Sequence, residues 1–588
     1  MNGHYIDFNK EYIASLPLWA REFANKYGSK TANLYILHGN IRDYLPHKSN
    51  AGEFTFTRIQ EYIADRLFGN QNIIVFYDRS SGVTFLDETM AADYQRIMCG
   101  KYPDLEDPAD LMSTDPQESF FYLEKYFLSR IPADRRERCR MVFIIDYAET
   151  VAPPGDLGRY SEEDRFCLVT LSRWASNPLF TDGDVSIILL TENLADISTR
   201  LTGSPATVKV GVPFPDEAVR QEFLESKLRE GKLILDRGLA CPQLAAVTNG
   251  LNLMNLDRLI SENFEIAKVL TLEYLRKKKK EIIENEAAGL LEFLETGFNL
   301  SHVSGHEFVK KRFKNAAKAI KKGRLDVLPM GYLLSGPVGT GKSFIVTAFA
   351  GEIGIPMVKF RNFRSKWQGD TESNLERILN ILKSMAPVAV MIDEADAFLG
   401  DRDQQGDSGT SNRVFAQLAS FMGNTEYRGK IIWFLITCRP DLVPIDLKRQ
   451  GRAEEHLALF YPETNTERED LFNTLVRKLD LDIRNFPVRD LFNTFKYEYS
   501  GADLEALLTR AKLLAAMEDR VFIRREDMEE AMGDFVPAAY PHEIELQNLV
   551  ATVECTSKEM LPPRLRKISG AELSQKIQEL KLLLGERS

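Results

Sequence analysis

The sequence has few cysteines, no long apolar run and no recognisable leader. Its 588 residues include six cysteines, which are scattered and form no C-x-x-C pair, so neither a zinc knuckle nor a disulfide framework is indicated. The longest apolar runs, such as residues 431–436, have the length of a strand and fall far short of the ~20 residues of a membrane span. The N-terminus is polar and lacks the apolar region of a signal peptide. We therefore expect a cytoplasmic protein without a membrane span.

An excess of positive charge is missing as well. The formal net charge is −11, which argues against wrapping of nucleic acid, because nucleic acid is itself an anion. The lysines at 277–280 are accompanied by glutamates, so the solvated face of a polar helix over 272–294 is favoured over a nucleic-acid patch. At 588 residues, with 44% hydrophobic and 27% charged residues, the chain is too long for one core and is expected to form several domains.

The stretch at 336–343 carries the clearest chemical signal. It reads G-P-V-G-T-G-K-S and lies between the apolar run 332–334 and helical-looking sequence. Glycines at this spacing let the backbone curl tightly, so that its N–H groups and the helix N-terminus face phosphate oxygens. Lys342 is expected to reach the β- and γ-phosphates and Ser343 to place its hydroxyl on Mg²⁺; the alternative is a glycine turn with a chance Lys-Ser pair. The residues predicted to contact nucleotide here are Gly336, Pro337, Val338, Gly339, Thr340, Gly341, Lys342, Ser343 and Phe344.

An acidic pair lies 51 positions after Lys342. Asp393 and Glu394 end the apolar run 388–392, which has the character of a buried strand. Asp393 is predicted to hold the Mg²⁺ shell through water, and Glu394 to take the proton from the attacking water. An apolar strand that ends in Asp-Glu is a weak signal alone, but at this distance from a phosphate loop it indicates a nucleotide hydrolase.

The two halves of the chain repeat one order of elements. In the first half, apolar strand-like runs alternate with helices, and one run ends at Asp146, 247 positions before Asp393. Such alternation predicts a parallel sheet covered by helices on both faces, and the repeat predicts two copies of one module. The predicted domains are an N-terminal helical segment (1–30), an α/β domain (31–210), a helical lid with a linker helix (211–296), a second α/β domain (297–460), a second lid (461–540) and a C-terminal helical extension (541–588).

Further motifs complete a resemblance to a known family. The phosphate loop and the acidic pair, together with residues 437–441, 449–452 and 500–504, resemble the AAA family of ring ATPases, and the tandem order resembles the valosin-containing-protein type. The resemblance implies an α/β fold of two P-loop-type AAA modules, each with a parallel sheet flanked by helices and a small helical lid. The first module is expected to be degenerate. The implied cofactors are ATP and Mg²⁺, with Ser343 and Asp393 at the metal.

The resemblance also implies an assembly whose subunits share sites. In a homo-hexamer of this type, Arg449 and Arg452 reach the neighbouring subunit's nucleotide and neutralise charge that develops on the γ-phosphate. Surface salt bridges are the alternative for both arginines. Gly501 and Ala502, in the 500–504 motif of the second helical part, are implied as further nucleotide contacts.

Residues 365–373 resemble the first pore loop of the family, where an aromatic side chain grips an extended polypeptide. Trp367 is the predicted grip, flanked by Lys366 and Gln368. A core tryptophan is the alternative, which these polar neighbours disfavour. Residues 406–412 are interpreted as a second pore loop, although a glycine-serine tract is also consistent with a plain loop.

The sequence departs from the family at positions that bear on turnover. Cys438 stands where the family usually has an asparagine that orients the attacking water, and a thiol is a weak hydrogen-bonding partner, so either Thr437 substitutes or turnover is slow. In the first half, Tyr147 stands in place of Glu394 and no Lys-Ser phosphate loop is present, so hydrolysis is expected in the second module alone. His306 and Glu307 are not followed by the second histidine of the metalloprotease motif, which excludes that branch.

Three functions are compatible with these features. The leading hypothesis is an ATP-hydrolysing unfoldase or remodelling motor that threads or disassembles protein substrates, with an adaptor protein supplying specificity. The alternative is an ATP-dependent hexameric scaffold or switch that recruits partners without threading. A nucleic-acid translocase is least favoured, because the chain is acidic and its candidate channel aromatic lies in a protein-gripping type of loop.

Overall fold

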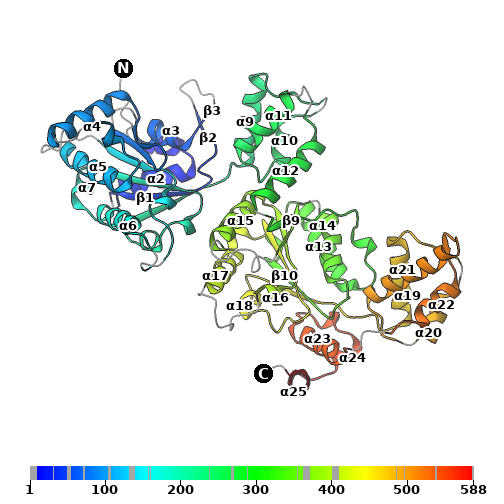
Figure 1. Cartoon of the computed structure of the whole chain (residues 1–588). Helices are drawn as coiled ribbons and strands as arrows, with labels where there is room; N and C mark the ends of the chain where they lie inside the picture. Colours follow the sequence, from blue (N-terminus) through cyan, green and yellow to red (C-terminus); the bar gives the residue numbers. More distant parts are fainter. Residues whose placement is uncertain are drawn as a thin grey trace. The chain divides into compact units, whose positions relative to one another are not determined.

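A computed structural model shows two compact units along the chain. The first comprises Met1–Ile283 with Glu372–Ser384, and the second comprises Glu284–Thr371 with Met385–Ser588. Figure 1 labels their helices and strands. The residues that the structure describes are 10–30, 32–48, 54–69, 73–103, 108–131, 140–155, 158, 160–236, 239–265, 270–287, 289–353, 355–361, 371–399, 410–484, 486–495, 497–536 and 540–585.

The first unit is built, within its described residues, on a six-stranded sheet. The strands lie in the order β5 (Gly82–Phe85), β4 (Ile73–Asp78), β6 (Met141–Ile145), β7 (Val185–Thr191), β1 (Leu34–Gly39) and β8 (Thr207–Val212). Neighbours pair in parallel except at the edge, where β5 runs antiparallel to β4. Strands β6 and β7 are buried along their whole length, which explains why both are continuous apolar runs. A separate hairpin joins β2 (Leu45–Lys48) to β3 (Phe54–Thr57).

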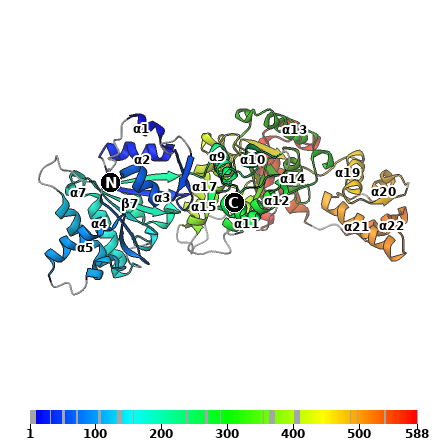
Figure 2. The ribbon, with the colours of Figure 1, turned by 90° about the horizontal axis from the view of Figure 1, so that it is seen from above.

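Helices cover both faces of this sheet. Figure 2 shows α2 (Leu18–Gly28) and α3 (Ile59–Tyr62) on one side, with α4 (Glu88–Lys101) and α5 (Pro116–Arg130) on the other. Because side chains alternate along a strand, Ile144 packs into the core beneath α2, whereas Phe143 packs into the core beneath α5. The other elements of this part are α1 (Lys10–Ser15), η1 (Ile63–Phe68), η2 (Pro108–Met112), η4 (Ala148–Thr150), α6 (Glu162–Ala175), α7 (Pro178–Asp182), η5 (Leu194–Asp196) and α8 (Thr199–Thr202).

A helical lid follows β8 in the chain. It contains α9 (Glu217–Arg229), α10 (Cys241–Val247) and α11 (Leu253–Glu265), after which α12 (Leu272–Glu286) leads into the second unit. The buried guanidinium of Arg220 ties two of these helices together, since its Nε and Nη2 donate to Ala245 O at 3.2 and 3.1 Å.

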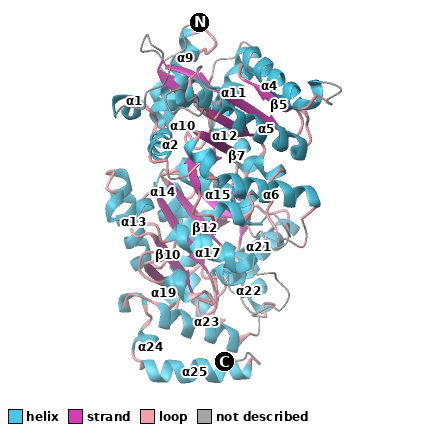
Figure 3. Cartoon of the chain, turned by 90° about the vertical axis from the view of Figure 1, so that its left-hand side faces the viewer, coloured by secondary structure: helices cyan, strands magenta, loops and turns pink. Residues whose placement is uncertain are grey.

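The second unit repeats the strand order of the first. Its sheet runs β14 (Glu455–Ala458), β10 (Gly331–Ser335), β13 (Ile431–Ile436), β12 (Val388–Ile392), β11 (Met357–Phe360) and β9 (Leu291–Phe293). All described neighbours pair in parallel except β9, which is antiparallel to β11. The strands are drawn in magenta among the cyan helices in Figure 3. The five parallel strands therefore have the same order in both sheets: β4, β6, β7, β1 and β8 in the first correspond to β11, β12, β13, β10 and β14 in the second.

The helices of the second unit form a face of the core, a lid and a C-terminal part. Helices α13 (Glu307–Lys321) and α14 (Lys342–Ile353) pack on the sheet through Phe313, Phe349 and Phe434, whose ring centroids lie 4.7 to 5.9 Å apart. The lid contains α19 (Asn465–Lys478), α20 (Val488–Thr494), α21 (Gly501–Met517) and α22 (Arg525–Gly533), with the short strands β15 (Asp482–Ile483) and β16 (Phe522–Ile523). The C-terminal part contains η9 (Lys558–Met560), α23 (Pro541–Glu554), α24 (Pro563–Arg566) and α25 (Gly570–Leu583). The remaining elements of this unit are η6 (Leu300–His302), η7 (Leu325–Val327), α16 (Ala395–Leu399), α17 (Thr410–Met422), η8 (Thr425–Tyr427) and α18 (Ile445–Lys448), while α15 (Thr371–Met385) belongs almost entirely to the first unit.

The predicted α/β class, with two mainly parallel sheets flanked by helices, is confirmed. The polar helix expected over 272–294 is wrong at its C-terminal end, because α12 stops at Glu286 and residues 291–293 pair with β11. The lysine run is also not uniformly solvated: Lys279 is 8% exposed, and its Nζ donates to Val247 O at 3.2 Å. No helix within the described residues combines the length and apolar character needed to cross a bilayer.

Candidate active site

The loop after β10 is shaped by glycines with positive φ. Gly336 (φ +136) lies against Leu459, just after β14, where a Cβ would come within 2.0 Å of the carbonyl oxygen. Gly339 (φ +80) is as tightly placed, since a Cβ there would lie 2.7 Å from Ser500 Oγ at the start of α21. Side chains other than hydrogen do not fit these positions. The loop is therefore held between the sheet edge and the lid, and Gly341 (φ +82) turns it into α14.

Lys342 opens α14 and its side chain folds back on the loop. It is 7% exposed, and its Nζ donates to Gly336 O at 2.9 Å and to Pro337 O at 2.7 Å. Thr340 Oγ1 also donates to Pro337 O, at 2.9 Å. Burial lowers the pKa of Lys342, because the ammonium loses hydration. An anionic ligand in the loop would compensate for that loss, so the donors present here fit a phosphate chain.

A hydroxyl and a carboxylate meet beside the loop. Ser343 Oγ lies 3.2 and 3.3 Å from the two carboxylate oxygens of Asp393, which follows β12. Hydroxyl and carboxylate oxygens are ligands that Mg²⁺ accepts readily, so this pair fits a metal ion bound together with phosphate. Lys359 of β11 shares the carboxylate, with its Nζ 2.9 Å from Asp393 Oδ2. Sequence reasoning missed Lys359; the available signal was a single lysine in an apolar run.

Glu394 has an unusual backbone conformation for a residue that is not glycine. Its φ is 51°, and its N–H donates to Asp393 Oδ1 at 3.2 Å. Its side chain is exposed. Strain of this kind is often retained at functional sites, and here it presents a carboxylate to water at the carboxyl end of β12.

The two residues after β13 have different surroundings. Thr437 is 1% exposed, and its Oγ1 donates to Asp396 Oδ1 at 2.7 Å while accepting the N–H of Arg439 at 2.8 Å. Cys438 lies nearer the loop, with its Sγ 3.3 Å from Lys342 Nζ. The thiol, rather than the threonine hydroxyl, is therefore the group that contacts the loop's lysine.

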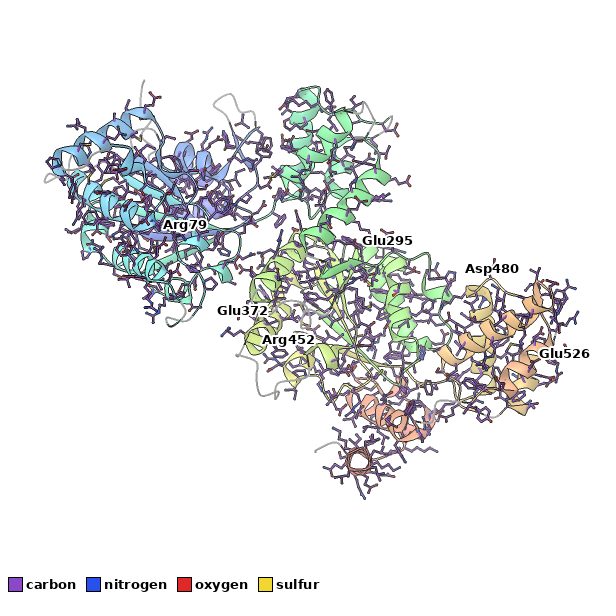
Figure 4. The ribbon with its side chains drawn as sticks, viewed as in Figure 1. Arg79, Glu295, Glu372, Arg452, Asp480 and Glu526 are labelled. Atoms are coloured by element: carbon purple, nitrogen blue, oxygen red, sulfur yellow. The ribbon has the colours of Figure 1, made fainter. Side chains whose placement is uncertain are left out.

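The two candidate arginine fingers also differ. The Arg449 side chain is 61% exposed, and its Nε is 3.8 Å from Asp446 Oδ1. The Arg452 side chain (Figure 4) is 12% exposed, and its Nη1 donates to Asp446 O. Arg452 is thus engaged within its own unit, whereas Arg449 extends into solvent.

The lid reaches the loop at the start of α21. Gly501 N donates to Gly339 O at 3.0 Å, and Ala502 follows it in the helix. Ser500 caps the helix, accepting from Asp503 N at 3.1 Å. Phe344, next along α14, lies beneath Lys478 of α19, whose Nζ is 4.8 Å from the ring centroid. The lid therefore contacts the loop directly at Gly339 and the start of α14 at Phe344.

The C-terminal part also contacts the loop, which sequence reasoning missed. Val338 N donates to Gln547 Oε1 of α23 at 3.1 Å, and Val338 O accepts from Tyr461. Nothing in the local sequence around Gln547 marks it as a loop contact, because the two residues are 209 positions apart.

The predicted pore-loop residues Lys366, Trp367 and Gln368 lie outside the described residues, as do residues 406–409 of the second candidate loop. Their roles stay predictions from the sequence.

A glycine loop between strand and helix, a buried lysine at its end and a hydroxyl–carboxylate pair beside it define a P-loop nucleotide-binding module. Comparison with known families agrees with this class. Residues 332–461 match the model described as "ATPase family associated with various cellular activities (AAA)". Residues 9–213 match "AAA+ chaperone, N-terminal Rossmann-like domain" and residues 218–288 match "AAA+ chaperone, second helical domain". Residues 9–213 and 218–288 are therefore similar to AAA+ chaperone domains, and residues 332–461 to an AAA ATPase domain.

Curated relatives are similar at low identity. A "Cell division cycle protein 48 homolog" from Archaeoglobus fulgidus is 26% identical over 442 residues, which cover 69% of this chain and 58% of the relative. An "Uncharacterized AAA domain-containing protein ycf46" from Trieres chinensis is 27% identical over 307 residues, covering 50% and 60%. "Protein SAV" from Sulfolobus acidocaldarius is 34% identical over 195 residues, covering 32% and 24%. The chain spans less than two thirds of the length of each of these three.

Proposed function

We propose that the second unit binds ATP with Mg²⁺ at the 336–343 loop and hydrolyses it. The observation that carries the proposal is the buried Lys342, whose ammonium is bonded to Gly336 O and Pro337 O at the start of α14. Ser343 and Asp393 would hold the metal ion, which supplies neutralising charge beside the phosphates. The exposed carboxylate of Glu394 is suited to accept a proton from the attacking water.

The proposal also covers the assembly of subunits and the use of ATP hydrolysis to remodel a protein substrate. Arg449 is exposed at the end of α18, as a residue must be if it completes a neighbouring subunit's site. We therefore propose a homo-hexamer in which ATP hydrolysis drives remodelling or threading of a protein substrate past Trp367, with an adaptor protein choosing the substrate. The resemblance of 365–373 to a pore loop supports the threading step.

A second candidate is a scaffold or switch that assembles with ATP and recruits partners without threading. The contact of Cys438 Sγ with Lys342 Nζ at 3.3 Å favours it, because a thiol at this place orients water poorly. Slow hydrolysis without stimulation by protein substrates would support the scaffold.

The test compares Glu394→Gln with Glu426→Gln, an exposed glutamate of η8 in the same unit. Glu394→Gln is expected to retain ATP binding and lose about 10²–10⁴-fold in turnover, whereas Glu426→Gln keeps both. Measuring the wild-type ATPase rate with and without a protein substrate then distinguishes the two functions, because stimulation by the substrate is expected of a motor and its absence of a scaffold. Turnover near the wild-type level in Glu394→Gln would remove this residue from the mechanism.

A further inference from the structure

The loop after β1 in the first unit begins like the loop after β10 in the second. Gly39 (φ +99) lies against Val212 at the end of β8, where a Cβ would be 2.6 Å from the carbonyl oxygen. Gly336 makes the corresponding approach to Leu459. After this shared start the two loops differ, since the loop of the second unit continues into α14 and that of the first unit leads into the β2–β3 hairpin.

The carboxylate at the end of β6 is neutralised by the same loop. Arg42 Nη1 lies 2.7 Å from Asp146 Oδ1 and 2.8 Å from Oδ2, and Gln60 Nε2 donates to Oδ2 at 2.8 Å. Asp146 is 8% exposed. The guanidinium also lies 3.9 Å from the ring centroid of Tyr147, which takes the place of Glu394 and has nearly the same backbone conformation (φ 48° against 51°). A cation from the chain therefore pairs with both carboxylate oxygens of Asp146, the strand-end acid that takes the place of Asp393.

The next residue supplies an anion to the lid. Asp43 is 1% exposed and accepts from Leu253 N at 3.0 Å and Met254 N at 2.8 Å, the first residues of α11. Asn40 Nδ2 donates to the same carboxylate at 2.8 Å. A carboxylate at a helix N-terminus is favourable for the reason that a phosphate is, because unpaired N–H groups and the helix dipole face it. In the second unit the corresponding helix, α21, approaches the phosphate loop.

We propose that the first unit carries built-in substitutes for its ligands: Arg42 stands in for the metal cation, and Asp43 stands in for the phosphate that would join the loop to the lid. The two residues are adjacent in sequence. Arg42 is bonded to Asp146 at the end of a sheet strand, and Asp43 is bonded to the start of α11 in the lid. A nucleotide would have to displace a half-buried ion pair and a buried helix cap. The lid α9–α11 is therefore clamped to its sheet, and the first unit is a rigid module that does not respond to nucleotide, whether or not the second unit hydrolyses ATP.

Hydrogen–deuterium exchange on the full chain tests nucleotide insensitivity. In Lys342→Ala protein, which removes the key phosphate ligand of the second unit, adding Mg-ATP or Mg-ADP is expected to leave exchange over 39–44 and 253–258 unchanged. In wild-type protein the same additions should slow exchange over 336–345, which shows that nucleotide is bound. Slower exchange over 39–44 or 253–258 on adding nucleotide would overturn the proposal, and a silent 336–345 would count against the proposed ATP site instead.

Substitution of Asp43 tests the clamp itself. Asp43→Ala is expected to raise exchange at the amides of Leu253 and Met254 about tenfold to hundredfold, since each loses a charged acceptor. Asp216→Ala is the matched control, because Asp216 caps α9 in the same lid by accepting from Val219 N at 2.9 Å; its effect should stay within α9. Asp43→Asn keeps a neutral acceptor and is expected to raise exchange by a smaller factor. Exchange at 253–254 in this variant tests the clamp if Asp43→Ala does not fold. Unchanged exchange at 253–254 in either Asp43 variant would refute the clamp.

Discussion

Replacing Lys359 by methionine is expected to strengthen Mg²⁺ binding at the second unit's site. Lys359 Nζ lies 2.9 Å from Asp393 Oδ2, and Ser343 Oγ bonds the same carboxylate. These are the oxygens that we propose for the metal ion. A divalent cation that enters there has to displace the ammonium, so the lysine competes with it.

The size of the effect follows from the exposure of the pair. The side chains of Lys359 and Asp393 are 33% and 23% exposed, so water screens them and the ion pair is worth about 0.5–1 kcal/mol. Because 1.4 kcal/mol corresponds to about a tenfold change in an equilibrium constant, the Mg²⁺ concentration at half-saturation is expected to fall about twofold to fivefold.

The assay is a Mg²⁺ titration of a fluorescent ATP analogue bound to the chain. Lys359→Arg retains the charge and should titrate close to the wild type. Lys321→Met removes an exposed lysine of α13, 3.5 Å from Glu352, and should have no effect. An unchanged midpoint in Lys359→Met would refute the competition, and a higher midpoint would mean that Lys359 contacts phosphate instead.

Three further outcomes are expected. Arg449→Ala should lower ATPase activity of the assembly about 10³-fold or more without changing Tm, whereas Arg452→Ala should lower Tm because that guanidinium is engaged within its own unit; equal behaviour of the two would contradict this division. Trp367→Ala should keep hexamer formation and basal ATPase while losing unfolding of a tagged protein, and a lower Tm would instead indicate a core tryptophan. Burial opposes the imidazolium of His456, yet its hydrogen bonds to Glu554 raise its pKa overall. The resulting stabilisation of the folded state is present below about pH 6.5 and is lost as pH rises through the folded-state pKa. Glu554→Gln should therefore flatten the dependence of Tm on pH between about 6 and 8.

The parts of the fold that the sequence predicts well are those in which local pattern and burial coincide. Strands such as β6 and β12 are buried on both faces, so they are unbroken apolar runs that end in an acid. Strand β9 was missed because it has only three residues and exists through pairing with β11, some 65 positions away. A three-residue run has too little pattern to be distinguished from the end of the preceding helix.

The residues of the candidate site likewise divide into those that the local sequence predicts and those that only tertiary packing brings together. Glycines, lysine and serine of the phosphate loop are adjacent in sequence, and their spacing reflects the curl that the backbone must make. Lys359 and Gln547 were not predicted, because each contacts the site through tertiary packing across distant segments. The exposure of Arg449 and the partial burial of Arg452 were also beyond sequence reasoning, since both follow from the path of the turn after α18.

The proposed substitutes in the first unit have a common physical reason. A helix N-terminus and a strand-end carboxylate both need partners, because buried N–H groups and a buried charge are costly when unpaired. In the second unit, we propose that phosphate and Mg²⁺ supply the anion and the cation. In the first unit, Arg42 and Asp43 meet both requirements with side chains of opposite charge. Loss of Arg42 would leave Asp146 without its charge partner, and loss of Asp43 would leave the start of α11 without an anion, so each residue meets a separate requirement.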